Sequence, residues 1–127
     1  MIKIQESGEM YLENILILGR EQNHIRAIDI VNRTGYSKPS ISRALKLLKE
    51  DGYINIDKSG YIVLTEDGRK TAEKIYERHK ILSDIFIKIG ISKENAVADA
   101  CKIEHDISDE TFEKIKNYFN QSKKDTQ

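Results

Sequence analysis

The chain of 127 residues lacks the features that mark secreted and membrane proteins. It has a single cysteine, Cys101, so no intramolecular disulfide can form, and we expect a reduced thiol. No apolar run approaches the roughly 20 residues that span a bilayer. The N-terminus also lacks the basic and then apolar pattern of a secretory signal. We therefore expect a protein of the cytoplasm without a membrane partner.

Signatures of catalysis are missing as well. The sequence contains no arrangement of nucleophile, base and acid, no glycine loop that cradles phosphate and no cofactor fingerprint. We therefore predict that the protein is not an enzyme. A metal-storage protein stays open as an alternative, because several side chains are of metal-binding types.

The chain has no net charge, because 21 Lys and Arg residues balance 21 Asp and Glu residues. This balance alone argues against a nucleic-acid partner, but the charges are segregated. Residues 34–49 carry four cations and no acid, whereas residues 92–113 carry seven acids and two lysines. Solvated helix faces account for either stretch taken singly. A DNA-binding part and a cation-binding part explain both together.

Residues 27–64 have the pattern of a winged helix. A helix is predicted over 27–33, where Gly35 can take the left-handed conformation that ends it. A second helix begins after Ser37 as N-cap, with Pro39 in its first turn. Residues 54–64 then alternate in polarity around a turn, which predicts a hairpin. Two short helices joined by a tight turn and followed by a hairpin make a winged helix-turn-helix.

The exposed side of the second helix carries small and basic side chains that suit a DNA major groove. Pro39 can touch thymine methyl groups, and Arg43 can read guanine or grip phosphate. Lys46 and the wing residue Lys58 are expected at the DNA backbone. A winged helix can also bind another protein through a similar basic face, and this alternative stays open. The predicted DNA-binding residues are Ser37, Pro39, Ser40, Ser42, Arg43, Lys46 and Lys58.

Apolar periodicity predicts four further helices, over residues 8–19, 66–89, 92–106 and 109–120. The fold is therefore predicted to be mainly α, with a winged-helix domain over residues 1–70 and an all-helical domain over residues 71–120. Residues 121–127 have no apolar side chain and are predicted to form a disordered tail.

Metal-binding side chains occur at two places in the sequence. Cys101, Glu104 and His105 have the i, i+3, i+4 spacing that shares one face of a helix. A second group lies far along the chain from these residues and comprises Met10, Glu13 and His79. Each residue taken singly is explained as a core filler or part of a solvated face. Together, soft sulfur with imidazole and carboxylate suits Fe(II), Co(II), Ni(II) or Zn(II) better than Mn(II), and we favour Fe(II).

Six motifs in collinear order resemble one known family. They are Glu9–Leu12, Ser37–Ser42, Leu64–Gly68, Arg78–His79, Ala100–His105 and Ser108–Glu110. Over residues 5–118 they are similar to the diphtheria toxin repressor family of metal-dependent regulators. The resemblance implies a homodimer that binds a palindromic operator in double-stranded DNA when Fe(II) or Mn(II) is abundant. It also implies repression of metal-homeostasis genes, with residues 71–120 forming the metal-binding and dimerisation domain.

The resemblance also implies a primary metal site of the iron type. Iron-type members place methionine, cysteine, glutamate and histidine where this chain has Met10, Cys101, Glu104 and His105. Manganese-type members put carboxylates where Met10 and Cys101 stand. The implied metal is therefore Fe(II), with Mn(II) as the alternative.

The chain departs from the iron-type members at their second metal site and in length. Of the three usual ligands only His79 is present, because Ser83 and Val97 stand where those members have glutamate and histidine. Glu13 matches a ligand position of the manganese type and is the candidate partner of His79 in an alternative second site. The chain stops before the SH3-like domain of longer members and in length resembles the manganese type. A winged-helix repressor that binds DNA without metal stays open as an alternative function.

Overall fold

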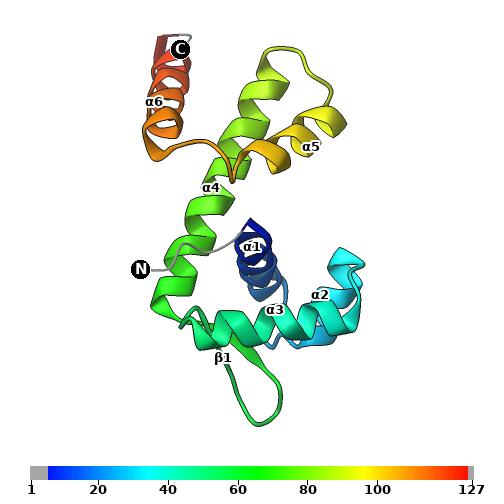
Figure 1. Ribbon diagram of the computed structural model, residues 1–127. Helices are drawn as coiled ribbons and strands as arrows, with labels where there is room; N and C mark the ends of the chain where they lie inside the picture. The colour runs from blue at the N-terminus through cyan, green and yellow to red at the C-terminus, as the bar shows by residue number, and fades with distance from the viewer. Residues whose placement is uncertain (1–5, 126–127) are drawn as a thin grey trace. The chain divides into compact units, whose positions relative to one another are not determined.

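The computed structural model of the protein describes the backbone of residues 6–125 and the side chains of residues 8–122. The chain divides into two compact units, a winged-helix unit up to Lys74 and a C-terminal unit from Ile75 (Figure 1). Each unit contains helices, and the two strands lie in the first unit. In chain order the elements are α1 (Glu6–Glu21), α2 (Ala27–Thr34), α3 (Lys38–Glu50), β1 (Ile54–Ile56), β2 (Ile62–Leu64), α4 (Glu66–Lys88), α5 (Lys93–Ile103) and α6 (Asp109–Asp125).

The helix-turn-helix is fixed by the local signals that predicted it. Gly35 follows α2 with a φ of 77°, a left-handed conformation that glycine adopts without steric cost, and its N–H donates to the carbonyl of Val31. Ser37 is the N-cap of α3, where its hydroxyl accepts a hydrogen bond from the N–H of Ser40 at 3.3 Å. Pro39 lies in the first turn, where a helix does not need its N–H.

The wing is an antiparallel hairpin of β1 and β2, in which Ile54 pairs with Leu64. Its turn is held by Asp57, whose Oδ1 accepts hydrogen bonds from the N–H groups of Ser59 at 2.8 Å and Tyr61 at 2.9 Å. The N–H of Ile62 donates to the carbonyl of Ile25 at 2.8 Å. This bond ties the outer strand of the wing to the segment before α2. The predicted winged helix is confirmed.

Each unit has its own apolar core. In the winged-helix unit the stripes of the helices meet the inner side of the hairpin, and the buried side chains include Leu12, Ile15, Ile30, Ile41, Leu45 and Ile54. In the C-terminal unit the second part of α4 packs with α5 and α6, and the buried side chains include Ile75, Leu82, Ala96, Ala100, Phe112 and Phe119. No helix in the described part of the chain has the length and apolar character to cross a membrane.

Three helices differ by about two residues or more from their predicted bounds. Helix α1 already includes Glu6 and continues to Glu21, beyond the predicted range of 8–19. Helix α6 continues through Asp125, so the predicted disorder of residues 121–125 is wrong, and residues 126–127 lie outside the described part. Lysine and glutamine are good helix formers, and extending an existing helix costs little, so α6 needs no further apolar side chain. The third difference, at the end of α5, affects the candidate metal site.

Candidate metal centre and nucleic-acid interface

The predicted DNA-binding residues lie on one unit and are accessible. Pro39, Ser42, Arg43 and Lys46 are exposed on α3, and Lys58 is exposed in the turn of the wing. Ser37 is exposed as well, whereas Ser40 is half-buried, and their hydroxyl groups are 2.8 Å apart in a hydrogen bond. Both serines therefore order the start of α3, and that start is where a recognition helix approaches base edges.

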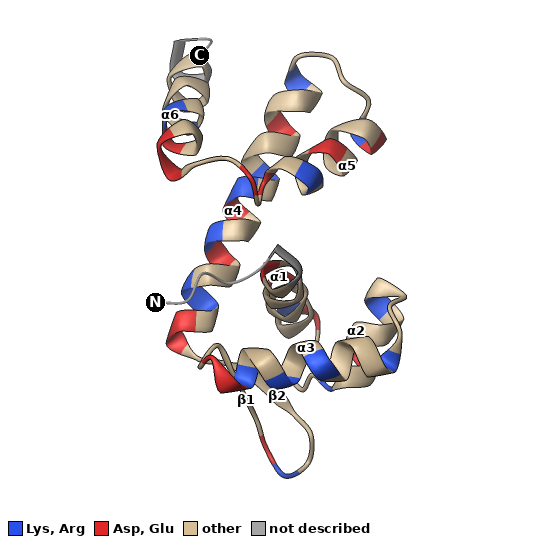
Figure 2. Cartoon of the chain, in the orientation of Figure 1, with Lys and Arg blue, Asp and Glu red and all other residues tan. Residues whose placement is uncertain are grey.

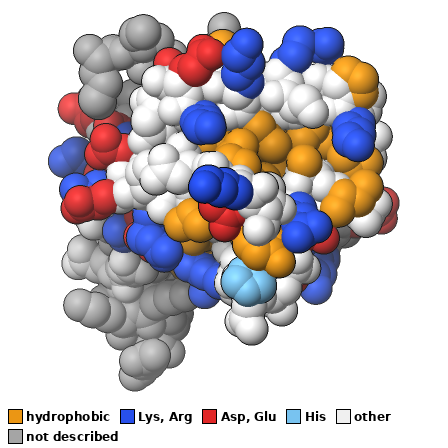
Figure 3. Space-filling view, turned by 90° about the horizontal axis from the view of Figure 1, so that it is seen from below, with side chains coloured by type: hydrophobic (Ala, Val, Ile, Leu, Met, Phe, Trp, Pro, Cys, Tyr) orange, Lys and Arg blue, Asp and Glu red, His pale blue; other side chains and the backbone are white. Residues whose placement is uncertain are grey.

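A groove of about 370 Å³ lies between α3 and the wing. Its lining combines apolar side chains such as Leu45 and Ile56 with the cations Lys46 and Lys49. Lys and Arg positions recur along α3, while acidic positions occupy the first turn of α6 (Figure 2). Figure 3 shows a face of the molecule on which Lys and Arg side chains surround hydrophobic ones. Helix α3 itself offers a polyanion several cations, with no acid before Glu50.

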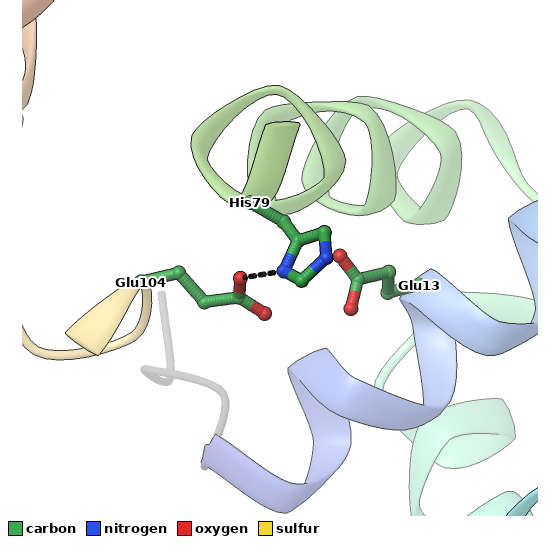
Figure 4. Close-up of side chains that lie close together, drawn as sticks. All are labelled: Glu13, His79 and Glu104. Atoms are coloured by element: carbon green, nitrogen blue, oxygen red, sulfur yellow. Dashed lines mark hydrogen bonds and ion pairs between the residues drawn. The ribbon is translucent and has the colours of Figure 1, made fainter. Parts of the chain in front are cut away.

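Three of the predicted metal-binding residues meet in the C-terminal unit. His79 lies on α4, and its Nδ1 is 2.9 Å from Oε2 of Glu104 (Figure 4). The Nε2 of His105 is 3.4 Å from Oε1 of the same carboxylate. Two imidazoles thus flank one carboxylate, each contacting a different one of its oxygen atoms.

The carboxylate of Glu104 is fully buried, with an exposed fraction of 0%. Its Oε1 accepts no hydrogen bond from the described residues. A buried carboxylate is costly unless a cation or hydrogen-bond donors compensate its charge. Imidazole and carboxylate are also the donors that Fe(II), Mn(II) and Zn(II) accept in proteins. The residues therefore fit a divalent transition metal, and a bound ion would compensate the charge of this carboxylate.

The helix on which the sequence placed Cys101, Glu104 and His105 ends earlier than predicted. Helix α5 ends at Ile103, and Glu104 is its C-cap, but Glu104 keeps helical dihedral angles (φ −61°, ψ −24°) and its N–H donates to the carbonyl of Ala100. Cys101 is exposed on α5, whereas Glu104 is buried and the side chain of His105 is only 4% exposed. The shared face of these three residues therefore stays a prediction. The structure gathers Glu104 and His105 with His79 and leaves Cys101 on the exposed side of α5.

The remaining predicted ligands belong to α1 of the winged-helix unit. Met10 is half-buried and Glu13 is buried, with an exposed fraction of 8%. Their i, i+3 spacing makes them neighbours on the surface of α1. Their thioether and carboxylate groups are of metal-binding types.

Sequence reasoning missed the role of Arg78, which precedes His79 on α4. Arg78 is 4% exposed, and its Nη1 donates to the carbonyl oxygens of Glu104 at 3.1 Å and Ile107 at 2.8 Å. Its Nη2 pairs with the carboxylate of Asp109. One signal was available in the sequence: Arg78 occupies a position in the apolar stripe of α4 between Ile75 and Leu82.

Two family models match the chain. The model described as "Iron dependent repressor, metal binding and dimerisation domain" matches residues 65–127, and the MarR family model matches residues 15–60. The transcriptional regulator MntR of Escherichia coli O6:H1 is 36% identical over 103 residues, which cover 81% of this chain and 66% of that protein. The HTH-type transcriptional regulator MntR of Geobacillus kaustophilus is 33% identical over 109 residues, covering 86% of this chain and 77% of that protein.

The chain belongs to the diphtheria toxin repressor family. Members of this family are DNA-binding transcriptional regulators and not enzymes, in agreement with the prediction. Among solved structures, that of the manganese regulator SloR superimposes with a TM-score of 0.80 at 24% identity. This likeness supports the winged-helix and helical fold of a family member. The match covers 89% of this chain and 53% of SloR, so the chain spans about half of that structure and less than two thirds of the Escherichia coli protein.

Proposed function

We propose that this protein is a cytoplasmic, metal-dependent transcriptional repressor that binds DNA as a homodimer and controls genes of metal homeostasis. The observation that carries the proposal is the buried carboxylate of Glu104 between the imidazoles of His79 and His105. It lies in the unit matched by the metal-binding family model, while the other unit is a winged helix with a basic recognition helix. A metal site and a DNA-binding module in one chain suit a metal sensor.

The proposed primary site combines donors from both units. Glu104 and His105 would hold the ion from the turn after α5, and Met10 would hold it from α1. Cys101 is included because the family resemblance places a ligand at its position. Glu13 and His79 would complete this site or form a second one beside it. The family membership and the metal-binding types of these side chains support this assignment.

Such a site would act on DNA binding by restraining α1. In the proposed mechanism, the position of α1 relative to residues 104–105 varies when no metal is bound. The distance between the two α3 helices of the dimer then varies as well. A metal bound by Met10 and Glu104 would restrict the distance between the two α3 helices to values that fit successive major grooves of a palindromic operator. A shift from mostly incompetent to mostly competent dimers requires a differential affinity of about 5 kcal/mol, which coordination bonds can supply.

We propose Fe(II) as the activating metal and Mn(II) as the alternative. The sulfur donors of Met10 and Cys101 favour a softer ion than the carboxylates that manganese-type members place at these positions. The matched relatives include regulators named for manganese, so the two metals must be compared directly. Replacing Met10 by Asp and Cys101 by Glu is expected to raise the response to Mn(II) relative to Fe(II).

Anaerobic fluorescence anisotropy measures this preference, with a labelled duplex selected from a random library by the protein in excess Mn(II). The double variant and the natural sequence are titrated with Fe(II) and with Mn(II). The variant is expected to reach half-maximal DNA binding at a lower Mn(II) concentration and a higher Fe(II) concentration. An unchanged ranking of the two metals contradicts the assignment of Met10 and Cys101 as ligands.

The exposed cations of α3 are expected to contribute differently to DNA binding. Arg43→Ala should cost about 1–3 kcal/mol and relax the preference for one base pair, because arginine can read guanine. Lys46→Ala should weaken binding to all sequences and lower the slope of log affinity against log salt by about one, because lysine neutralises phosphate. Anisotropy between 50 and about 200 mM salt with the selected duplex measures both effects.

The matched control for these variants is Lys80→Ala, which removes an exposed lysine of α4. Its affinity and salt dependence are expected to equal those of the natural sequence. Equal salt dependence for Lys46→Ala and the natural sequence would show that α3 does not face DNA. Binding that persists unchanged in excess chelator would instead favour a metal-independent winged-helix repressor.

A further inference from the structure

The guanidinium of Arg78 connects three backbone segments of the C-terminal unit. It reaches from α4 to the carbonyl of Glu104 at the end of α5, to the carbonyl of Ile107 in the following turn and to the carboxylate of Asp109 at the start of α6. Its Cζ also lies 5.3 Å from the ring centroid of Phe112. The side chain therefore spans the whole turn that carries two of the proposed ligands.

We propose that Arg78 is a positioning residue that holds the turn at residues 104–107 in its metal-binding arrangement before the metal arrives. This inference rests on the proposed function and adds to it a residue that does not itself bind the metal. Arg78 and His79 are adjacent on α4 and hold Glu104 at opposite ends. Arg78 donates to the backbone carbonyl of Glu104, and His79 contacts the carboxylate of Glu104. Both the backbone and the end of the Glu104 side chain are therefore held in place.

The chemistry of this position is specific for arginine. A guanidinium offers five N–H donors in a rigid planar fork, whereas an ammonium is a single compact charge. Only the fork can reach two carbonyl oxygens and one carboxylate in the directions that the turn requires. Its charge also lies at the C-terminal end of α5, where the exposed carbonyl groups favour a cation. Asp109 pairs with that charge, which lowers the cost of burying it.

A turn held in this way lowers the cost of binding a metal. If the turn were mobile, its ordering would oppose binding, because each immobilised residue loses conformational entropy. Partners that orient metal ligands typically contribute a factor of about 10 to 100 to metal affinity. We therefore expect Arg78→Met to weaken Mn(II) binding by about 10- to 100-fold while every proposed ligand remains in the chain.

The first test is hydrogen–deuterium exchange of the metal-free protein, which does not depend on metal or DNA. The N–H groups of Glu104 and Asp106 donate to Ala100 and Ile103 at 3.0 Å. These amides are expected to be protected in the natural sequence and to exchange at least about tenfold faster in Arg78→Met. Arg78→Lys should lie close to Arg78→Met, because charge without the fork cannot hold both carbonyls.

The second test is Mn(II) affinity by isothermal titration of the same proteins. Arg69→Met is the matched control, because it removes an exposed arginine of α4 that forms an ion pair with Glu73 at 3.8 Å. It should match the natural sequence in both measurements. If Arg78→Met does not fold, Arg78→Lys and Asp109→Asn decide the question, since each keeps a polar group at its position.

Equal exchange rates of the turn in Arg78→Lys, Asp109→Asn and the natural sequence, together with equal Mn(II) affinity, overturn the inference about Arg78. The same holds if the turn of the natural sequence becomes protected only when Mn(II) is added. A natural sequence that binds neither Mn(II) nor, under anaerobic conditions, Fe(II) overturns the proposed function instead. Fast exchange and weakened Mn(II) binding confined to the Arg78 and Asp109 variants support the inference.

Discussion

Replacing Glu104 by alanine is expected to abolish metal-stimulated DNA binding while leaving the fold intact. Glu104 is the buried carboxylate that two imidazoles flank, so its removal eliminates the charge that a divalent ion would neutralise. The loss of metal affinity should exceed the roughly 100-fold effect typical of residues that only orient ligands. The backbone carbonyl of Glu104 remains, and Arg78 can still donate to it. Circular dichroism should therefore be unchanged.

Two variants make this test specific. Glu104→Gln keeps the volume of the side chain and removes its charge, so it should lose the metal response nearly as fully as Glu104→Ala. Glu113→Ala removes an exposed acid of the same unit and should behave as the natural sequence. Anisotropy with the selected duplex, with and without Mn(II), measures all of them. An undiminished metal response in Glu104→Ala would refute the site.

The second large effect is expected at Gly68, in the first turn of α4. A Cβ at this position would lie 1.9 Å from the carbonyl oxygen of Tyr53 and 2.9 Å from its carbonyl carbon. The obstacle is backbone and cannot rotate away, so Gly68→Ala must separate the start of α4 from the residue before β1. We expect it to lower the free energy of unfolding by about 3 kcal/mol, as overpacking against a rigid neighbour does.

Gly19 offers the matched control, because it also lies inside a helix. A Cβ there would meet Cδ1 of Ile25 at 3.5 Å, which is an ordinary contact. Gly19→Ala should therefore stabilise the protein by about 0.5–1 kcal/mol, the usual gain for glycine to alanine in a helix. Urea denaturation followed by circular dichroism measures both changes. Equal stability of the two variants would show that Gly68 is not required for the packing of the wing against α4.

The winged helix was predictable because its signals are local. Gly35 ends α2, Ser37 caps α3 and Asp57 closes the turn of the wing, and each acts on residues within four positions of itself. The end of α5 was not predictable in this way. Neither glutamate nor histidine ends a helix, so the sequence predicts that the helix continues through Glu104 and His105. The helix ends where Arg78, 26 positions earlier in the chain, takes the carbonyl of Glu104.

The candidate site was predicted in part for the same reason. Side chains of metal-binding type were recognisable in the sequence, and His79, Glu104 and His105 do meet in the C-terminal unit. Their burial depends on tertiary packing, and Cys101 is exposed whereas Glu104 is buried. Arg78 interrupts the apolar stripe of α4, yet its partners lie in segments whose positions only the tertiary structure supplies.

The central claim is that one divalent ion, held by α1 and by the turn after α5, makes the protein competent to bind DNA. Anaerobic titration of the purified protein with Fe(II), followed by the anisotropy of the selected duplex and then by excess chelator, tests it most directly. We predict that DNA affinity rises at least about tenfold as the metal is added and falls back when the chelator removes it. DNA affinity that is the same before metal, with metal and after chelator would contradict the account.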